Sequence, residues 1–161
     1  MKTIYLAGGC FWGTQKFLAQ FDGVQETETG YANGKTEHPT YEEVCQGSGH
    51  AETVRVLYDE NVISLTKLLH FYFMAIDPTA VNHQGEDFGE QFRTGIYYDD
   101  ESLLPEIRAV ENETRESLAR EGKELAVEVL PLQQFYSAEE YHQDYLAHEE
   151  LPEALEQCRY W

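Results

Sequence analysis

The sequence is poor in cations and has no long hydrophobic run. Its 161 residues include 11 Lys and Arg against 30 Asp and Glu, which gives a formal net charge of −19. A chain this acidic repels phosphate groups and anionic lipids, so nucleic acids and membrane surfaces are disfavoured as partners. The longest strongly apolar stretch, 65–76, is interrupted by Lys67 and His70 and is far shorter than the roughly 20 residues of a membrane span. We therefore expect a soluble protein.

Cysteine is scarce as well. The three cysteines, Cys10, Cys45 and Cys158, are too few and too widely spaced to form the disulfide framework of a small secreted domain. Residues 1–3 lead directly into a strand-like run, without the long apolar region of a signal peptide. These two features predict a reducing, cytoplasmic environment.

Apolar residues are nevertheless plentiful. Hydrophobic residues make up 42% of the chain and aromatic residues 13%, more than a disordered acidic chain would carry. The sequence contains no repeat, no low-complexity tract and no flexible linker, and its length is that of one domain. A single packed domain over residues 1–161 is expected.

The spacing of the apolar residues predicts the secondary structure. Runs and alternation predict strands over 3–7, 24–32, 53–58, 95–98 and 125–130. Helical spacing and capping residues predict helices over 11–21, 40–45, 65–76, 101–121 and 137–148, the last one capped by Ser137 with Glu140 three residues later. The segment 79–93 has no periodicity and is typical of a functional loop. This order predicts an α+β fold, a two-layer sandwich with a ferredoxin-like βαββαβ core plus an additional helix, strand and C-terminal segment.

The run Gly8-Gly9-Cys10-Phe11-Trp12-Gly13 carries the clearest chemical signal. It places Cys10 between a buried strand and the first turn of a helix, where unpaired N–H groups and the helix dipole favour a thiolate. The two aromatic residues that follow can wall a small apolar pocket. From residue types alone, Cys10 is equally well interpreted as a small buried core residue, because free cysteine is among the most buried residue types.

This run resembles the GCFWG signature of the A-type peptide methionine sulfoxide reductases. Further blocks resemble the family in the family's order and extend the resemblance over residues 4 to about 146. They are Gly30-Tyr31-Ala32-Asn33-Gly34, His38-Pro39-Thr40-Tyr41, Val44-Cys45, Gly49-His50-Ala51-Glu52, Asp77-Pro78, Gln84-Gly85, Asp87, Gln91-Phe92-Arg93 and Tyr141-His142-Gln143 with Tyr145-Leu146. The family is one of the enzymes that restore methionine from its sulfoxide.

The resemblance assigns roles to three catalytic residues. It implies that Cys10 is the thiolate that attacks the sulfoxide sulfur and becomes a sulfenic acid. It implies that Glu52 donates the proton and Tyr41 is a phenol donor to the sulfoxide oxygen. A carboxyl can do this only if it stays partly protonated near neutral pH, so we expect burial to raise the pKa of Glu52. Without the resemblance, Glu52 would be interpreted as a solvated acid and Tyr41 as a packing residue.

The resemblance also implies a substrate pocket. Phe11 and Trp12 would hold the S-methyl group of the substrate, and Asp87 would lie beside the pocket in contact with substrate. Phe92 departs from the family, since most members have a second tyrosine there. One hydroxyl near the sulfoxide oxygen is therefore missing, and we predict slower but real catalysis.

Recycling of the oxidised enzyme is the less specific part of the resemblance. Many members carry resolving cysteines in a glycine-rich C-terminal tail, and this chain lacks those glycines after Leu146. Cys158 is the candidate resolving cysteine because it lies three residues from the terminus, and a bystander thiol is the alternative. Cys45 resembles a structural position. The family uses thioredoxin or dithiothreitol as external reductant and no bound metal or organic cofactor, and we expect a monomer that repairs proteins in the oxidative stress response.

Three other interpretations of the residues are weaker. Cys10 could act in hydrolysis with His50 or His142 as the base, but no orienting partner for such a base is evident. An acidic interaction module with Cys10 in the core is the non-catalytic alternative. A metal site is disfavoured, because the polar residues of the last predicted helix form neither an HExxH nor a CxxC pattern; they are Glu140, His142, Asp144, His148 and Glu149.

Overall fold

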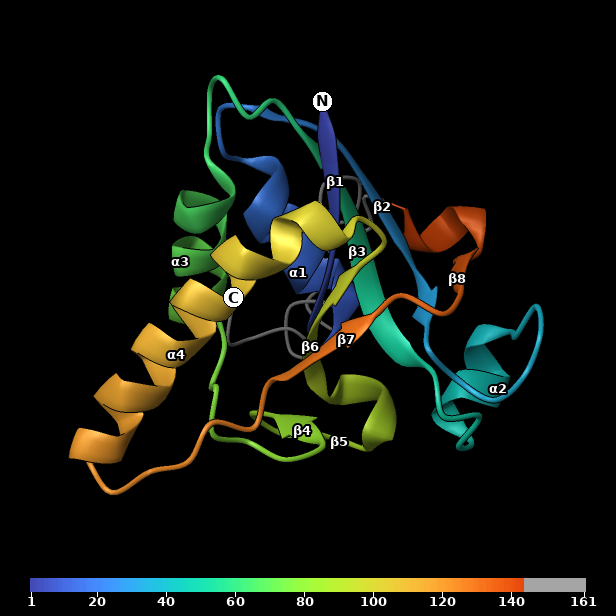
Figure 1. Cartoon of the computed structure of the whole chain (residues 1–161). Coiled ribbons are helices and arrows are strands. Elements are labelled where there is room, and N and C mark those ends of the chain that lie inside the picture. The colour runs from blue at the N-terminus through green and yellow to red at the C-terminus, as the bar shows by residue number, and fades with distance from the viewer. Residues whose placement is uncertain (144–161) are drawn as a thin grey trace.

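The computed structural model describes residues 1–143, and its helices and strands are shown in Figure 1. The strands are β1 (Lys2–Gly8), β2 (Val24–Ala32), β3 (Ala51–Tyr58), β4 (His83–Gln84), β5 (Asp87–Phe88), β6 (Thr94–Tyr98), β7 (Glu128–Pro131) and β8 (Phe135–Ser137). The α-helices are α1 (Phe11–Ala19), α2 (Tyr41–Cys45), α3 (Leu65–Ala75) and α4 (Leu104–Arg120). Three short 3-10 helices are η1 (Glu90–Phe92), η2 (Glu101–Leu103) and η3 (Glu140–His142).

One mixed sheet organises the chain. Its strand order is β7-β6-β1-β3-β2-β8, while β4 and β5 form a separate two-stranded hairpin. Only the β6–β7 pair is parallel among the neighbours of the large sheet within residues 1–143. β3 lies between β1 and β2, and its register places Glu52 opposite Tyr31 of β2. These strands and the helices confirm a mixed helix-and-strand class.

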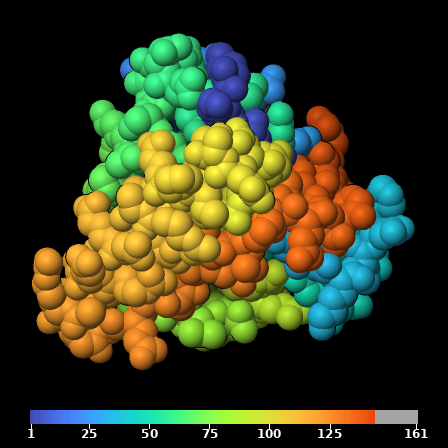
Figure 2. Space-filling view, in the orientation of Figure 1, coloured from blue at the N-terminus to red at the C-terminus, as the bar shows by residue number. Residues whose placement is uncertain are grey.

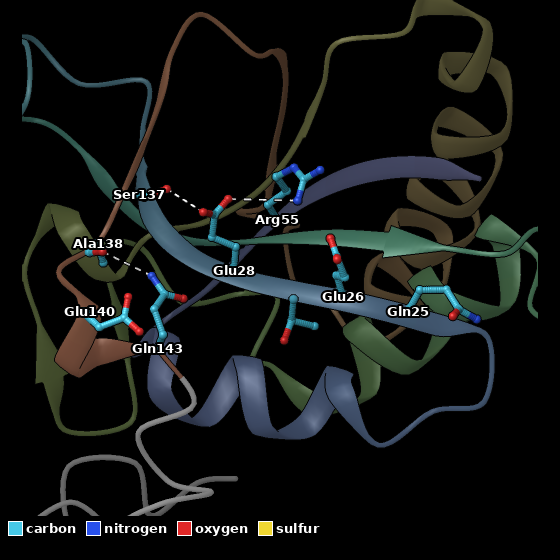
Figure 3. Close-up of a pocket in the computed structure, with 9 residues that line it drawn as sticks. Gln25, Glu26, Glu28, Arg55, Ser137, Ala138, Glu140 and Gln143 are labelled. Carbon is cyan, nitrogen blue, oxygen red and sulfur yellow. Dashed lines mark hydrogen bonds and ion pairs between the residues drawn. The ribbon is translucent and has the colours of Figure 1, made fainter.

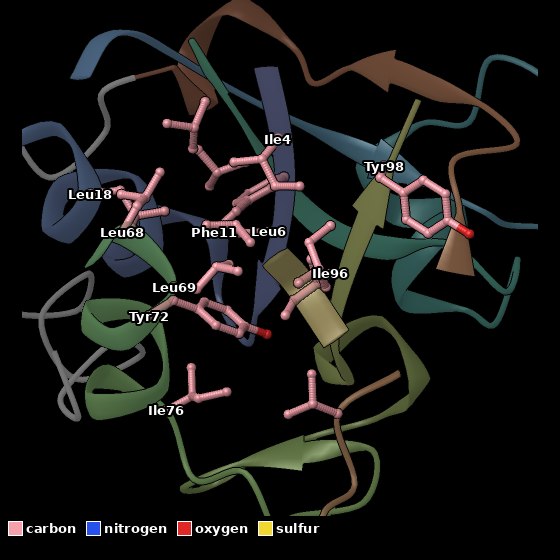
Figure 4. Close-up of a cluster of buried hydrophobic side chains, with 14 of the residues drawn as sticks. Ile4, Leu6, Phe11, Leu18, Leu68, Leu69, Tyr72, Ile76, Ile96 and Tyr98 are labelled. Atoms are coloured by element: carbon pink, nitrogen blue, oxygen red, sulfur yellow. The ribbon is translucent and has the colours of Figure 1, made fainter. Parts of the chain in front are cut away.

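The two faces of the sheet are packed differently. Ile4 and Leu6 of β1 face a large core that includes buried residues of α1, α3 and α4, and Figure 4 shows this cluster. Tyr5 and Ala7 alternate with them and face a second, smaller cluster with Tyr97, against which Phe135 packs. Leu132 and Phe135, which follow β7, cover this second face, and Figure 2 shows the darker orange surface of this part of the chain to the right of α4.

The predicted element order is confirmed for most of the described chain. Ser64 caps α3 by accepting a hydrogen bond from the amide of Lys67, and the apolar stripe beginning at Leu65 and Leu68 is buried. Thr40 and Glu43 form the capping box at the start of α2. No helix within residues 1–143 is long and apolar enough to cross a membrane.

Two expectations are wrong. The segment 79–93 is not an irregular loop throughout, because it contains β4, β5 and η1. Ser137 does not cap a helix: it ends β8, and its hydroxyl donates to Oε2 of Glu28 at 2.6 Å. Glu140 begins only the 3-10 helix η3, and the remainder of the helix predicted over 137–148 lies outside the described residues.

Candidate active site

Cys10 lies at the junction of β1 and α1, as the sequence predicts. It is the N-cap residue of α1 and is 5% exposed. Gly9 before it has φ +87°, and a Cβ atom there would come within 2.7 Å of the Gln84 Cβ atom. Only glycine accommodates both the backbone angle and this close approach of the β4–β5 hairpin. Gly9 thus lets the hairpin pack directly against the cysteine turn.

Glu52 lies beside this turn. The Phe11 amide donates a hydrogen bond to Glu52 Oε1 at 3.1 Å, and the Glu52 side chain is buried in the middle of the sheet. Burial raises the pKa of Glu52 to about 8; the Phe11 amide opposes this rise and nearby Asp87 adds to it. Within residues 1–143, the second carboxyl oxygen, Oε2, has no hydrogen-bond partner. A carboxyl of this kind is largely protonated at neutral pH and has a proton available to donate.

Tyr41, in the first turn of α2, lies near Glu52 and Cys10. Its amide donates to Glu139 Oε2 at 3.1 Å. Burial, followed by the charges of Glu52, Cys45 and Cys10, raises the pKa of Tyr41 above its ordinary value. The phenol is therefore a neutral hydrogen-bond donor close to both Glu52 and Cys10.

Aromatic rings form one wall of the site. The Tyr41 ring stacks on Phe11 and on Trp12, with centroid distances of 6.3 and 6.4 Å. His142 packs against the same rings, 4.4 Å from Tyr41 and 5.6 Å from Trp12. The Trp12 indole Nε1–H donates to His142 Nδ1 at 2.9 Å, which fixes the indole within the wall. Segments 130 positions apart in the sequence thus build a single apolar surface beside Cys10.

His142, Tyr31 and Glu139 also lie around this site and were not predicted as site residues. From the sequence, His142 has a chemical role only in two of the weaker alternatives, as a hydrolytic base and in a metal cluster. In the structure its Nδ1 accepts the Trp12 hydrogen bond, and burial lowers its pKa. His50, the other candidate base, uses Nε2 to contact the Thr36 carbonyl at 2.7 Å. Both histidines therefore have structural contacts, which disfavours the hydrolase alternative.

The remaining predicted residues are Asp87, Phe92, Cys45 and Cys158. Asp87 of β5 is close enough to Glu52 to raise its pKa, and burial raises the pKa of Asp87 itself. Phe92, at the end of η1, is partly buried against the large core, and η1 contacts β3. Cys45 ends α2 and shares a hydrogen bond with Tyr41. Cys158 lies outside the described residues.

A separate hollow of about 700 Å³ lies along β2 and η3. Figure 3 shows it lined by polar side chains such as Glu28, Arg55 and Gln143. It contains none of the predicted catalytic residues, so its position gives no reason to assign it to the chemistry at Cys10. In the part of the chain that is described, no group of three His, Cys, Asp or Glu side chains could hold a metal ion.

Comparisons with known proteins point to one family. The family model described as peptide methionine sulfoxide reductase matches residues 2–160. Proteins called peptide methionine sulfoxide reductase MsrA are similar: that of Clostridium perfringens is 53% identical, covering 91% of this chain and 92% of its own, and that of Lachnoclostridium phytofermentans is 54% identical, covering 90% and 86%.

Solved structures show the same likeness. Methionine sulfoxide reductase A of Corynebacterium diphtheriae is 34% identical with a TM-score of 0.88, covering 94% of this chain and 77% of that one. Reduced Mxr1 from Saccharomyces cerevisiae is 37% identical with a TM-score of 0.84, covering 91% and 84%. The chain therefore belongs to the A-type peptide methionine sulfoxide reductases and is an oxidoreductase that reduces methionine sulfoxide.

Proposed function

We propose that the chain reduces methionine-S-sulfoxide, in proteins and as the free amino acid, through a sulfenic acid on Cys10. The Cys10 sulfur attacks the sulfoxide sulfur, the S–O bond breaks, and the oxygen ends on Cys10. Methionine gains the two electrons that Cys10 loses. Glu52 supplies the proton that the departing oxygen needs, and the Tyr41 hydroxyl donates a hydrogen bond to it.

The buried state of Glu52 is the observation that carries this proposal. Its carboxyl accepts a hydrogen bond at 3.1 Å from the amide of Phe11, the residue directly after Cys10, so the proton donor on β3 is held against the turn that carries the nucleophile. With a pKa of about 8, the carboxyl keeps its proton at neutral pH. A surface carboxylate would be ionised there and could not act as an acid.

The aromatic wall supports a small apolar substrate group. Phe11 and Trp12 directly follow Cys10 in the chain, and their rings pack with Tyr41 into one apolar wall. Sulfur and methyl groups pack favourably on aromatic rings. We assign this surface to the S-methyl group and Asp87 to contact with the rest of the substrate. Phe92 has no hydroxyl, so Glu52 and Tyr41 are the two residues that polarise the sulfoxide oxygen.

For recycling, we propose that the Cys158 thiol condenses with the Cys10 sulfenic acid, which forms a disulfide and releases water. A thioredoxin dithiol then reduces that disulfide. The structure of Mxr1 in complex with Trx2, whose Mxr1 chain is 27% identical to this chain with a TM-score of 0.61, supports a thioredoxin partner. We propose that this cycle needs no bound metal or organic cofactor. We further propose that the enzyme is a monomer and repairs proteins in the cytoplasm.

We propose that the enzyme is one domain over residues 1–161. We infer that its core is a ferredoxin-like βαββαβ unit, supported by the strand order β6-β1-β3-β2 and by helices after β1 and β3.

The test is reduction of the separate S and R epimers of N-acetylmethionine sulfoxide with dithiothreitol. We expect reduction of the S epimer only: one wall of rings and one proton donor favour a single epimer, and membership of the A-type family implies that this epimer is S. Equal reduction of both epimers, or reduction of R alone, would overturn the proposal. The matched control is Cys10→Ser, which should reduce neither epimer.

A further inference from the structure

Glu139 connects two parts of the site that are far apart in the sequence. Its Oε1 accepts a hydrogen bond from the Tyr31 hydroxyl at 2.8 Å, and its Oε2 accepts one from the Tyr41 amide at 3.1 Å. Tyr31 belongs to β2, whereas Tyr41 is the first residue of α2. Both oxygens of one carboxylate are therefore used to join the sheet to the helix that carries the phenol.

Tyr31 is a rigid anchor for this connection. It is fully buried, it lies opposite Glu52 in the β2–β3 register, and its ring is 5.7 Å from that of Phe11. A hydroxyl on such a residue has a fixed position relative to the proton donor. Because one oxygen of Glu139 binds this hydroxyl, the other oxygen is also fixed, and it binds the amide of Tyr41.

Tyr41, by contrast, lies on a short helix, where its side chain shares a hydrogen bond with Cys45. α2 has only five residues and follows a long connection from β2 that includes His38 at φ +45°. A helix this short is not stable by itself, so contacts from outside set its position. The carboxylate of Glu139 binds the backbone of Tyr41 directly, and His142, three residues after Glu139, packs on the Tyr41 ring at 4.4 Å.

The charge of Glu139 suits this task. Burial opposes its ionisation, but hydrogen bonds from the Tyr41 amide and the Tyr31 hydroxyl are among the contacts that lower its pKa. Hydrogen bonds to an ionised acceptor are shorter and stronger than neutral ones. In Glu139→Gln the amide oxygen accepts from the Tyr41 amide and the NH₂ group faces the Tyr31 hydroxyl, which has to turn and accept, so both contacts lose the charge that strengthens them.

We propose that Glu139 is a positioning residue for sulfoxide reduction, which holds Tyr41 so that its hydroxyl reaches the sulfoxide oxygen. Glu139 does not touch the substrate in this account and acts only through Tyr41. The inference rests on the proposed role of Tyr41 as donor to that oxygen.

The experiment is a double-mutant cycle on the single-turnover rate of sulfoxide reduction, measured without any reductant. The variants are Glu139→Gln, Tyr41→Phe and the two together, and Glu140→Gln is the matched control because Glu140 is the exposed neighbour with the same charge. We expect Glu139→Gln to slow the rate constant about tenfold and Glu140→Gln to change it less than about twofold. In the Tyr41→Phe background, Glu139→Gln should have no further effect.

The amplitude of the single turnover counts the folded enzyme, so a loss of folded protein cannot imitate a loss of rate. If Glu139→Gln fails to fold, Tyr31→Phe takes its place in the cycle. This variant removes the hydroxyl that donates to Glu139 Oε1 and keeps the carboxylate. An unchanged rate constant in Glu139→Gln, or losses that multiply in the double variant, would overturn the inference alone. A Tyr41→Phe variant as fast as the unmodified chain would overturn the role of Tyr41, and with it this inference.

Discussion

Substitution of Glu52 by glutamine should slow catalysis strongly and make the protein more stable at alkaline pH. The glutamine side chain would keep an oxygen for the Phe11 amide, which donates to Oε1 of Glu52 at 3.1 Å, but it would have no proton to give. Loss of a general acid costs about 100- to 10,000-fold in rate. The gain in stability arises because the wild-type carboxyl is buried, has no oppositely charged partner among residues 1–143, and must ionise at high pH.

The size of that gain follows from the pKa of Glu52, which is about 8 in the folded protein and 4.5 in its ordinary state. A group whose pKa is raised by folding binds its proton more tightly when folded. Its contribution to stability is therefore complete below the ordinary pKa and is lost as the pH rises towards the folded one. Between pH 5 and pH 8 this loss amounts to about 3 to 4 kcal/mol, at 1.4 kcal/mol per pKa unit.

The assay is urea unfolding of both proteins at pH 5, 6, 7 and 8. The difference in free energy of unfolding, Glu52→Gln minus wild type, should increase steadily with pH, and the wild-type single-turnover rate should fall above pH 8 as Glu52 loses its proton. A stability difference that stays constant over this range would refute the argument, since it would mean that Glu52 has an ordinary pKa. The same comparison can be made in an Asp87→Asn background. Asp87→Asn removes the charge that adds to the raised pKa of Glu52, so the stability difference between the proteins with and without Glu52→Gln should increase less with pH.

Three further variants test other parts of the site. Phe92→Tyr restores a hydroxyl beside the sulfoxide oxygen, so kcat should stay the same or rise, and a clear loss of kcat in steady-state assays would contradict this. Cys158→Ser should still release one equivalent of methionine but lose thioredoxin-driven cycling, with Cys45→Ser as the control that keeps it; unaltered cycling in Cys158→Ser would rule out its resolving role. Gly9→Ala adds a Cβ atom within 2.7 Å of the Gln84 Cβ at φ +87°, so it should cost at least about 1 kcal/mol in urea unfolding and slow the reductase step. Wild-type stability in Gly9→Ala would mean that the hairpin is not packed on the cysteine turn.

The sequence was most informative where the evidence is local. The position of Cys10 at a strand–helix junction follows from adjacent residues, namely a buried run, two glycines and a helical pattern, and the structure has that junction. The cap of α3 at Ser64 is likewise set within four residues. Such features depend on the immediate neighbours of a residue and can be read without knowing the fold.

Features that depend on strand pairing were beyond the sequence. Ser137 with Glu140 three residues later matches the pattern of a helix start, but pairing of β8 with the edge of β2 takes Ser137 into a strand. The burial of Glu52 likewise depends on the register of β3 with its two neighbours, which no short window contains. Glu139 was missed because it is one of 30 acidic residues, and only the fold brings it to Tyr31 and Tyr41.

The hydrogen bond from Trp12 to His142 spans 130 positions and has a consequence for synthesis of the chain on the ribosome. The nucleophile and the three strands around Glu52 lie within the first 58 residues, so they leave the ribosome early. The residues that complete the aromatic wall emerge only after most of the remaining chain. During this interval Cys10 is a thiol without a finished pocket, and the length of its exposure to stray oxidants depends on the time that the ribosome needs to translate the segment between β3 and η3.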